Sequence, residues 1–375
     1  MFTTLVLASS LICGCGSGGG TTGTNPPPTA TAAAAPNITT FSNSSAQNGA
    51  VTAVLGFTTP GSVIHYTLDG STPTSASQIY QAPILVSTNL TIKALASATG
   101  YKDSSVASQS FTPNIPAGTL VWSDEFSNSG TSNALPDSKN WTYDTGYQCC
   151  GNNEQETYCA AGSATAPCDT NNPNAYVDTT GILHIKARNP LGTTYTSARL
   201  KTQGQFSFMY GRIEARIKLP ESQAMWPAFW LLGNNIATLS WPACGELDVM
   251  EHIDGSNPPP YAGGTPAGHD WVQSSIHGTN LNGGTPFTET GFSAAAWHTY
   301  GMIWTKGQIQ FYVDDPSSVY ETFTSTSQGG TWPFDQGPQF VILNLAVGGS
   351  WPGNVDGTTV FPGDMQVDYV RIYTN

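Results

Sequence analysis

The sequence predicts an all-β protein in which a small immunoglobulin-like β-sandwich precedes a larger two-sheet β-sandwich of the jelly-roll type. The 375 residues include 40 Gly and 26 Pro, which favours many turns over long helices. Short runs of β-branched and aromatic residues recur along the chain and are bounded by Gly, Pro, Asn or Asp. Because no segment sustains an apolar repeat of 3.6 residues, strands are expected throughout.

Charged residues are scarce, and acids outnumber bases. Only 10% of the residues are Asp, Glu, Lys or Arg, and the formal net charge is -13. Phosphate contacts need Lys and Arg, so this balance disfavours nucleic acid as a partner. The 10 Trp and 15 Tyr suit a neutral partner that stacks on aromatic faces. We expect a monomer.

The first 15 residues predict export. The apolar run LVLASSLIC at 5–13 is too short to span a membrane and is typical of a signal peptide, although no Lys or Arg precedes it. The segment ICGC at 12–15 resembles a bacterial lipobox, which implies lipidation of Cys15 and a membrane contact through that anchor alone. Ordinary secretion is the alternative. Residues 16–37 lack large apolar side chains and are predicted to form a flexible linker.

Residues 38–113 are predicted to form the small sandwich. The runs VTAVLGFTT, VIHYTL and ILVSTNLTIKALA are separated by turn residues, and Asp69-Gly70 suits a tight turn. The string YTLDGSTPT at 66–74 resembles the chitobiase/β-hexosaminidase C-terminal domain, an immunoglobulin-like accessory module that usually accompanies a catalytic domain. We therefore expect that cutting the chain near residue 116 leaves a soluble, active domain.

Residues 119–375 are predicted to form the larger sandwich. Strand signals continue through ILHIKA, RIEARIKL, AFWLL, IQFYVD and VDYVRIY. In RIEARIKL, the residues Ile213, Ala215 and Ile217 would face one side of a strand and the charged residues the other. A unit of roughly 250 residues exceeds an immunoglobulin domain and suits a jelly roll.

The strand GELDVMEH at 245–252 carries three acids in an apolar setting. On a regular strand Glu246 and Asp248 share a face, and Glu251 points to the other. One β-bulge between Asp248 and Glu251 would bring all three to the same face. Such a group suits glycoside hydrolysis with retention, which needs a nucleophile and a proton donor about 5–5.5 Å apart.

At these residues the sequence resembles glycoside hydrolase family 16 in its laminarinase-like, endo-β-1,3-glucanase branch. The family motif E-x-D-x-x-E is matched in full, and further matches are WSDEF at 122–126, MWPAFWLLG at 225–233 and MQVDYVRIY at 365–373. The resemblance implies that Glu246 is the nucleophile and Glu251 the general acid/base. Asp248 would hydrogen-bond the nucleophile and keep their protonation states apart. No cofactor is expected for catalysis.

The resemblance also implies residues that bind a neutral β-glucan. Trp226 and Trp230 lie four positions apart, hence on one face of a strand, and would flank the cleavage site. Asn153 and Arg199 match positions that hydrogen-bond a sugar on the non-reducing side. His277 matches a histidine of the cleft.

Family members often carry a structural calcium ion, and Glu125 and Asp368 match contributing positions. Two loop tryptophans, Trp332 and Trp351, either extend the cleft or pack within their loops. His252 directly follows Glu251 and is expected on the opposite side of the strand.

An inserted loop in QCCGNNEQETYCAAGSATAPCD carries extra cysteines. The catalytic region holds Cys149, Cys150, Cys159, Cys168 and Cys244. One or two disulfides are expected in an oxidising compartment. Because adjacent cysteines are poorly placed to bridge each other, we expect Cys149 and Cys150 to bond to the cysteines of the loop, in an order that remains open.

The leading hypothesis is a retaining endo-β-1,3-glucanase, either secreted or held at the cell surface as a lipoprotein. One alternative is a hydrolase of mixed β-1,3/1,4-glucan, although many dedicated enzymes of that kind lack the extra residue between Asp248 and Glu251. Another is a non-catalytic glucan-binding protein on the same scaffold. That alternative normally requires loss of the carboxylates, and all three are present.

Overall fold

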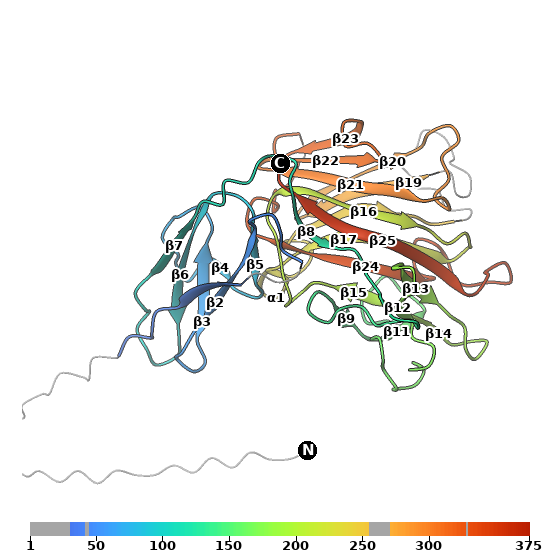
Figure 1. The fold of residues 1–375 in the computed structure, drawn as a ribbon, viewed down its shortest axis with the longest axis horizontal. Coiled ribbons are helices and arrows are strands. Elements are labelled where there is room, and N and C mark those ends of the chain that lie inside the picture. The colour runs from blue at the N-terminus through green and yellow to red at the C-terminus, as the bar shows by residue number, and fades with distance from the viewer. Residues whose placement is uncertain (1–30, 42–44, 255–270, 328) are drawn as a thin grey trace, which may run out of the picture.

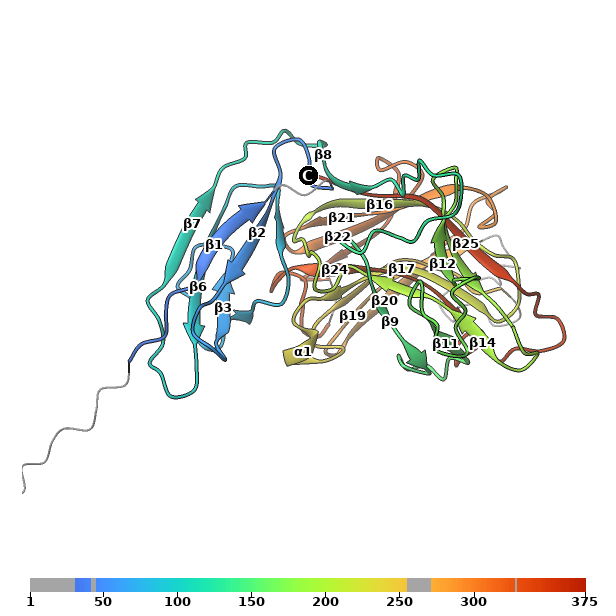
Figure 2. The ribbon, with the colours of Figure 1, turned by 60° about the horizontal axis from the view of Figure 1, so that its bottom comes forward.

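The computed structural model describes residues 31–41, 45–254, 271–327 and 329–375. This part of the chain is almost entirely β-structure, with one short helix, α1 (Ile236–Leu239). Two sandwiches pack against each other (Figure 1 and Figure 2). The expected export signal and most of the expected linker lie outside the described residues. Among those that are described, no helix has the length and apolar character needed to cross a membrane.

The smaller sandwich has two sheets. A three-stranded sheet holds β1 (Asn37–Phe41), β2 (Val51–Gly56) and β5 (Ile84–Val86). A four-stranded sheet holds β4 (Gln78–Ile79), β3 (Val63–Thr67), β6 (Leu90–Ser97) and β7 (Ala107–Phe111). Their inner faces bury a core that includes Leu55, Ile64 and Ile92. The fully buried Tyr66 packs edge-on against Tyr80 with ring centroids 6.2 Å apart, so these two tyrosines serve packing.

The larger sandwich is built from two long sheets and one short one. The first holds β12 (Ala175–Val177), β13 (Leu183–Ala187), β25 (Gly363–Tyr373), β16 (Gly211–Lys218), β21 (His298–Thr305), β22 (Gln308–Val313) and β23 (Val319–Thr324), with β8 (Leu120–Asp124) paired to β25. The second holds β20 (Leu281–Phe287), β19 (Val272–Gly278), β18 (Glu246–Glu251), β17 (Met225–Gly233), β24 (Gln339–Val347), β15 (Arg199–Lys201) and β9 (Thr142–Asp144). The short sheet holds β10 (Gly146–Tyr147), β11 (Glu156–Tyr158) and β14 (Tyr195–Ser197).

The main core lies between the two long sheets. Ile213, Ala215 and Ile217 alternate along β16 and are fully buried, as their period predicts. Phe229 and Leu231 on β17 are buried in the same cluster. The all-β, two-sheet sandwich predicted for this part of the chain is confirmed.

The two sandwiches share backbone hydrogen bonds and part of one core. The Leu85 N–H donates to the Ser207 carbonyl, and the Ser207 N–H donates to the Pro83 carbonyl, both at 2.8 Å. Leu85 also belongs to the same buried cluster as Trp122 and Phe206 of the larger sandwich. The small sandwich is therefore packed directly against the larger one.

Candidate active site

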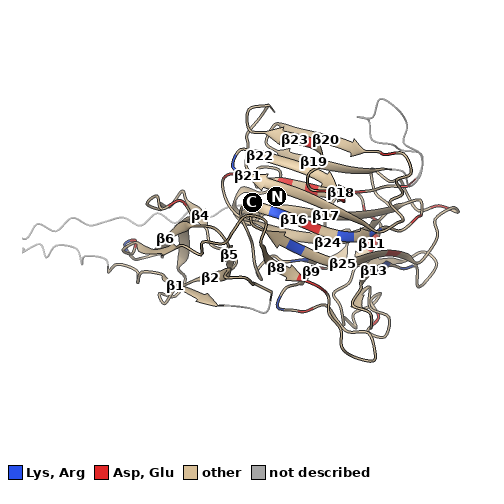
Figure 3. Ribbon diagram, turned by 45° about the horizontal axis from the view of Figure 1, so that its top comes forward, with Lys and Arg blue, Asp and Glu red and all other residues tan. Residues whose placement is uncertain are grey.

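The three acids of β18 lie on one face because the strand contains a bulge. Asp248 is paired with Ser275 of β19, and Glu251 is paired with Gln273, so two residues of β18 oppose one residue of its neighbour. The extra residue reverses the alternation and returns Glu251 to the face of Glu246 and Asp248. Most strand positions carry no charge, which sets these acids apart (Figure 3).

The seven-stranded sheet and the loops around it line an open cavity of about 880 Å³. Seven of the residues predicted for catalysis or binding line it: Arg199, Trp226, Trp230, Glu246, Asp248, Glu251 and His277. Asn153 does not belong to this lining. Its side chain is exposed and donates to Ser350 Oγ at 2.9 Å, while its neighbours Asn152 and Glu154 line the cavity. The role predicted for Asn153 is thus not supported by its placement.

Asp248 is the most deeply buried acid of the three, with 3% of its surface exposed. Ser275 Oγ donates to Asp248 Oδ2 at 2.6 Å and lies 3.3 Å from Glu251 Oε2. His277 Nε2 lies 3.1 Å from the same Asp248 oxygen and 3.9 Å from Glu246 Oε1. Asp248 is therefore held as an acceptor between a hydroxyl and an imidazole.

Burial and mutual repulsion keep protons on this group. Burial, reinforced by the charge of Asp248, raises the pKa of Glu246 to about 8. Burial and the charge of Asp248 likewise raise the pKa of Glu251 to about 8. The Trp226 indole donates to Glu251 Oε1 at 3.0 Å, and this hydrogen bond opposes the rise. Burial alone would lower the pKa of His277, but the hydrogen bond and charge of Asp248 and the two glutamates raise it to about 9. Such a group can hold and release a proton near neutral pH.

Aromatic rings surround the acids. The Trp226 ring meets Trp351 edge-on at 5.4 Å, and Trp351 also lines the cavity. The Trp230 indole donates to Asn344 Oδ1 at 2.7 Å, and the Arg199 guanidinium lies 4.5 Å from the Trp230 ring centre. These flat faces next to hydrogen-bonding groups suit a sugar chain.

Of the two loop tryptophans, Trp351 extends the cavity, whereas Trp332 packs against the core and meets Phe334 edge-on at 4.8 Å. His252 is buried, with its Nδ1 2.9 Å from the Trp271 carbonyl oxygen, and does not line the cavity.

Sequence reasoning missed several residues that line the cavity, including Trp241, Ser275 and Asn344. Trp241 is 57% exposed, and its ring centre lies 6.4 Å from that of His277. Its place in SWPACGE, five positions before Glu246, was the available signal. The remaining two come from strands whose neighbours only the sheet order defines.

The side chains proposed for calcium do not form a cation site together. Glu125 accepts two hydrogen bonds from Arg371, at 2.9 and 2.8 Å, and Asp368 accepts one from Arg216 at 2.7 Å. Each carboxylate is therefore neutralised by a guanidinium, and this donor set does not fit a calcium ion.

The disulfide pairing differs from the expectation. Cys149 is bonded to Cys150, and Cys159 is bonded to Cys168. Cys159 is buried at the end of β11, and the loop after it returns Cys168 to within 5.7 Å of it, Cα to Cα. Within the described residues, Cys244 is the free cysteine, and it is buried.

Two family models match parts of this chain. The family model described as "Glycosyl hydrolases family 16" matches residues 163–371, and the model described as "Fn3 associated" matches residues 54–111. A beta-glucanase of Rhodothermus marinus is 39% identical, over 68% of this chain and 84% of that protein. A glucan endo-1,3-beta-glucosidase A1 of Niallia circulans is 33% identical, over 70% of this chain but 38% of that protein. The catalytic domain of a laminarinase from Thermotoga petrophila aligns with a TM-score of 0.57 and 32% identity, over 70% of this chain and 99% of that domain.

Proposed function

Because the chain belongs to glycosyl hydrolase family 16, we propose that it is a retaining endo-glycoside hydrolase that cleaves the β-1,3 bonds of a neutral glucan. The observation that carries this function is the bulged strand β18, which sets the buried Asp248 and the half-buried Glu246 and Glu251 side by side in an open cavity. The aromatic lining and the net charge of -13 favour a neutral polysaccharide over a sulfated one.

Double displacement assigns a role to each of the two glutamates. Glu246 attacks the anomeric carbon and forms a covalent glycosyl-enzyme, while Glu251 gives its proton to the departing glycosidic oxygen. Glu251 then takes a proton from water, which attacks the same carbon and releases the sugar with retained configuration. Burial and the charge of Asp248 raise the pKa values of both glutamates to about 8, so the pair can hold the proton that the reaction needs near neutral pH, and the two roles follow from the order of the acids in the family motif.

The nature of the glucan is tested by hydrolysis of laminarin, lichenan and agarose with product sizing. Rapid formation of oligosaccharides from laminarin supports an endo-β-1,3-glucanase. Faster cleavage of lichenan would favour the mixed-linkage alternative. The bulge between Asp248 and Glu251 argues against that alternative, because many dedicated mixed-linkage enzymes lack the extra residue. Binding of laminarin without hydrolysis would reveal a non-catalytic glucan-binding protein and contradict the proposal.

For the small sandwich we propose an accessory module of the chitobiase/β-hexosaminidase C-terminal type. The match of residues 54–111 to the Fn3-associated model supports an accessory role. Lipidation at Cys15 would hold the enzyme at the cell surface. Membrane fractionation of wild type against Cys15→Ser tests the anchor, and equal release of both into the medium would indicate plain secretion.

A further inference from the structure

A second pair of acids, Glu154 and Glu156, lies at the edge of the cavity, at the start of β11. Glu156 is fully buried and Glu154 is 3% exposed. Glu154 lines the cavity, whereas Glu156 lies behind it and takes no part in the double displacement. A buried pair of like charges is costly unless one of them carries a proton.

The hydrogen bonds of the pair require that proton. Glu156 Oε2 accepts the Val347 N–H at 2.8 Å. Glu156 Oε1 and Glu154 Oε2 receive no other donor from the described protein, and the two carboxyl groups hydrogen-bond each other. Two carboxylates have no hydrogen to share, so one of the pair is an acid. Glu156 is the member of the pair that lies away from the open cavity, and burial together with the charge of Glu154 raises its pKa to about 9, which favours Glu156 as the protonated member.

A directed chain of hydrogen bonds joins this pair to the cavity. The Trp230 indole can only donate, so the oxygen of Asn344 must face it, and Asn344 Nδ2 then donates to the Tyr158 hydroxyl at 3.2 Å. Tyr158 passes its own hydrogen to Glu154. Glu154 is thereby an acceptor, and Glu156 completes the chain by donating to it.

We propose that Glu156 is a positioning residue for glucan binding, whose proton fixes Glu154, Tyr158 and Asn344 and thereby holds the Trp230 indole in the cavity. This inference rests on the proposed function. Arg199 stands over the same indole and would be oriented with it. The loop that contains Asn152 and Glu154 lines the same cavity.

Loss of the proton at high pH should loosen the arrangement. The ionisable groups that face Glu156 are Glu154 on its own loop, Tyr158 along β11, and Arg199 across Tyr158 on β15. Tyr195 is opposite Glu156 in the register of β14, Tyr147 belongs to β10, and β24 contributes the Val347 N–H. Arg199 is the one cation of this set and is paired with Asp144 at 3.0 Å, so nothing here compensates a second negative charge.

The test compares the wild type with Glu156→Gln. The Gln carbonyl can accept the Val347 N–H and its amide can donate to Glu154, so the variant keeps the chain of hydrogen bonds without a titrating group. KM and kcat for laminarin are measured from pH 7 to pH 10. One pH unit above the pKa about a tenth of the wild type retains the proton, so its KM should rise about tenfold, while Glu156→Gln shows no such rise.

Two further variants keep the outcomes separate. Glu156→Ala should raise KM already at pH 7, and the exposed Glu289→Gln should follow the wild type. Titration of the catalytic acids is common to all variants, so it cancels in the comparison. Identical KM profiles for wild type and Glu156→Gln would overturn the inference.

If laminarin is not hydrolysed at all, the proposed function fails, and the inference is judged by tryptophan emission instead. A change in emission between pH 7 and pH 10 in the wild type that is absent in Glu156→Gln would still support a fixed Trp230. The same change in both proteins would exclude it.

Discussion

His277 Nε2 lies 3.1 Å from Asp248 Oδ2, which couples a histidine of β19 to the central acid of the bulged strand. The carboxylates hold the imidazole in its charged form, since they raise the pKa of His277 to about 9. In return, the positive charge limits the rise that burial and Asp248 cause in the pKa values of Glu246 and Glu251. The histidine therefore influences the pH at which the two glutamates exchange their protons.

Replacing His277 should move the pH optimum. With His277→Gln the cation is lost, so the pKa values of both glutamates rise. The nucleophile then ionises at a higher pH, and the acid keeps its proton to a higher pH. Both limbs of the kcat/KM profile should move upward, which is measured on soluble laminarin from pH 4 to pH 10. An unchanged acidic limb would show that His277 has no electrostatic role.

Neutralising either glutamate should abolish most activity without unfolding the protein. Glu246→Gln removes the nucleophile and Glu251→Gln the proton donor, and each should lower kcat on laminarin by roughly 10³-fold or more. Circular dichroism checks the fold, and Glu289→Gln serves as the matched control. Azide should restore turnover to Glu246→Ala and yield a product of inverted configuration. Near-normal rates in either Gln variant would refute the assigned roles.

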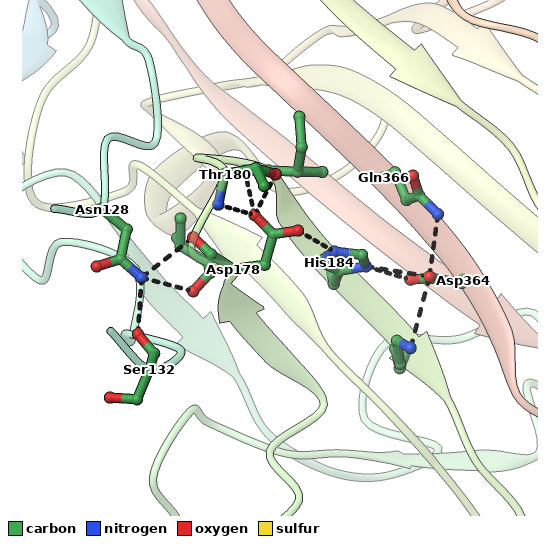
Figure 4. Close-up of polar contacts among 10 residues, drawn as sticks. Asn128, Ser132, Asp178, Thr180, His184, Asp364 and Gln366 are labelled. Carbon is green, nitrogen blue, oxygen red and sulfur yellow. Dashed lines mark hydrogen bonds and ion pairs between the residues drawn. The ribbon is translucent and has the colours of Figure 1, made fainter. Parts of the chain in front are cut away.

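His184 on the eight-stranded sheet links two aspartates (Figure 4). Its Nδ1 lies 3.0 Å from Asp364, and its Nε2 lies 3.3 Å from Asp178. Burial alone would lower the pKa of His184, but Asp364 and Asp178 outweigh it and raise the pKa. Although burial opposes the shift, hydrogen bonds from Ile182, Thr180 and His184 lower the pKa of Asp178 to about 2.

The His184 cluster should stabilise the fold only within a pH window. The stabilisation from a raised histidine pKa is complete below about pH 6.5 and is lost as the pH rises through the folded-state pKa. The stabilisation from the aspartates is present above about pH 4 and is lost as the pH falls. His184→Gln should therefore lower the free energy of unfolding by about 1 kcal/mol at pH 5.5 and by less at pH 9. Urea denaturation at both pH values measures this, and an equal loss at both would argue against a charged histidine.

Removing the small sandwich should cost stability more than activity. A chain that begins at residue 116 loses the hydrogen bonds to Ser207, together with those between Gln47 and Val121 and between Ser45 and Ser123. At about 1 kcal/mol for each of four bonds, the loss is on the order of 4 kcal/mol, and Tm should fall by on the order of 10 °C. Turnover of soluble laminarin should stay within about twofold of the full chain, because none of the residues that line the cavity precedes Cys150. An unchanged Tm would show that these contacts contribute little.

The local pattern of residues was sufficient to predict the catalytic strand and the fold class. A period of two along β16 predicts its buried face, because successive side chains of a strand point to opposite sides. The spacing of Glu246, Asp248 and Glu251 predicts the bulge for the same reason, since without it three costly acids would not share a face. These features depend on neighbours a few positions apart, so the sequence by itself determined them.

Other features of the site were decided by the tertiary structure, because they depend on which distant strands pair with each other. Cys149 bonds to its neighbour Cys150 while Cys159 bonds to Cys168, and Glu125 faces an arginine because β8 pairs with β25. The chain from Glu156 to Trp230 crosses three strands that are far apart in the sequence, β11, β24 and β17. Sheet order, buried contacts and proton sharing arise only when the long-range pairings form, because no local period encodes the partner of a strand.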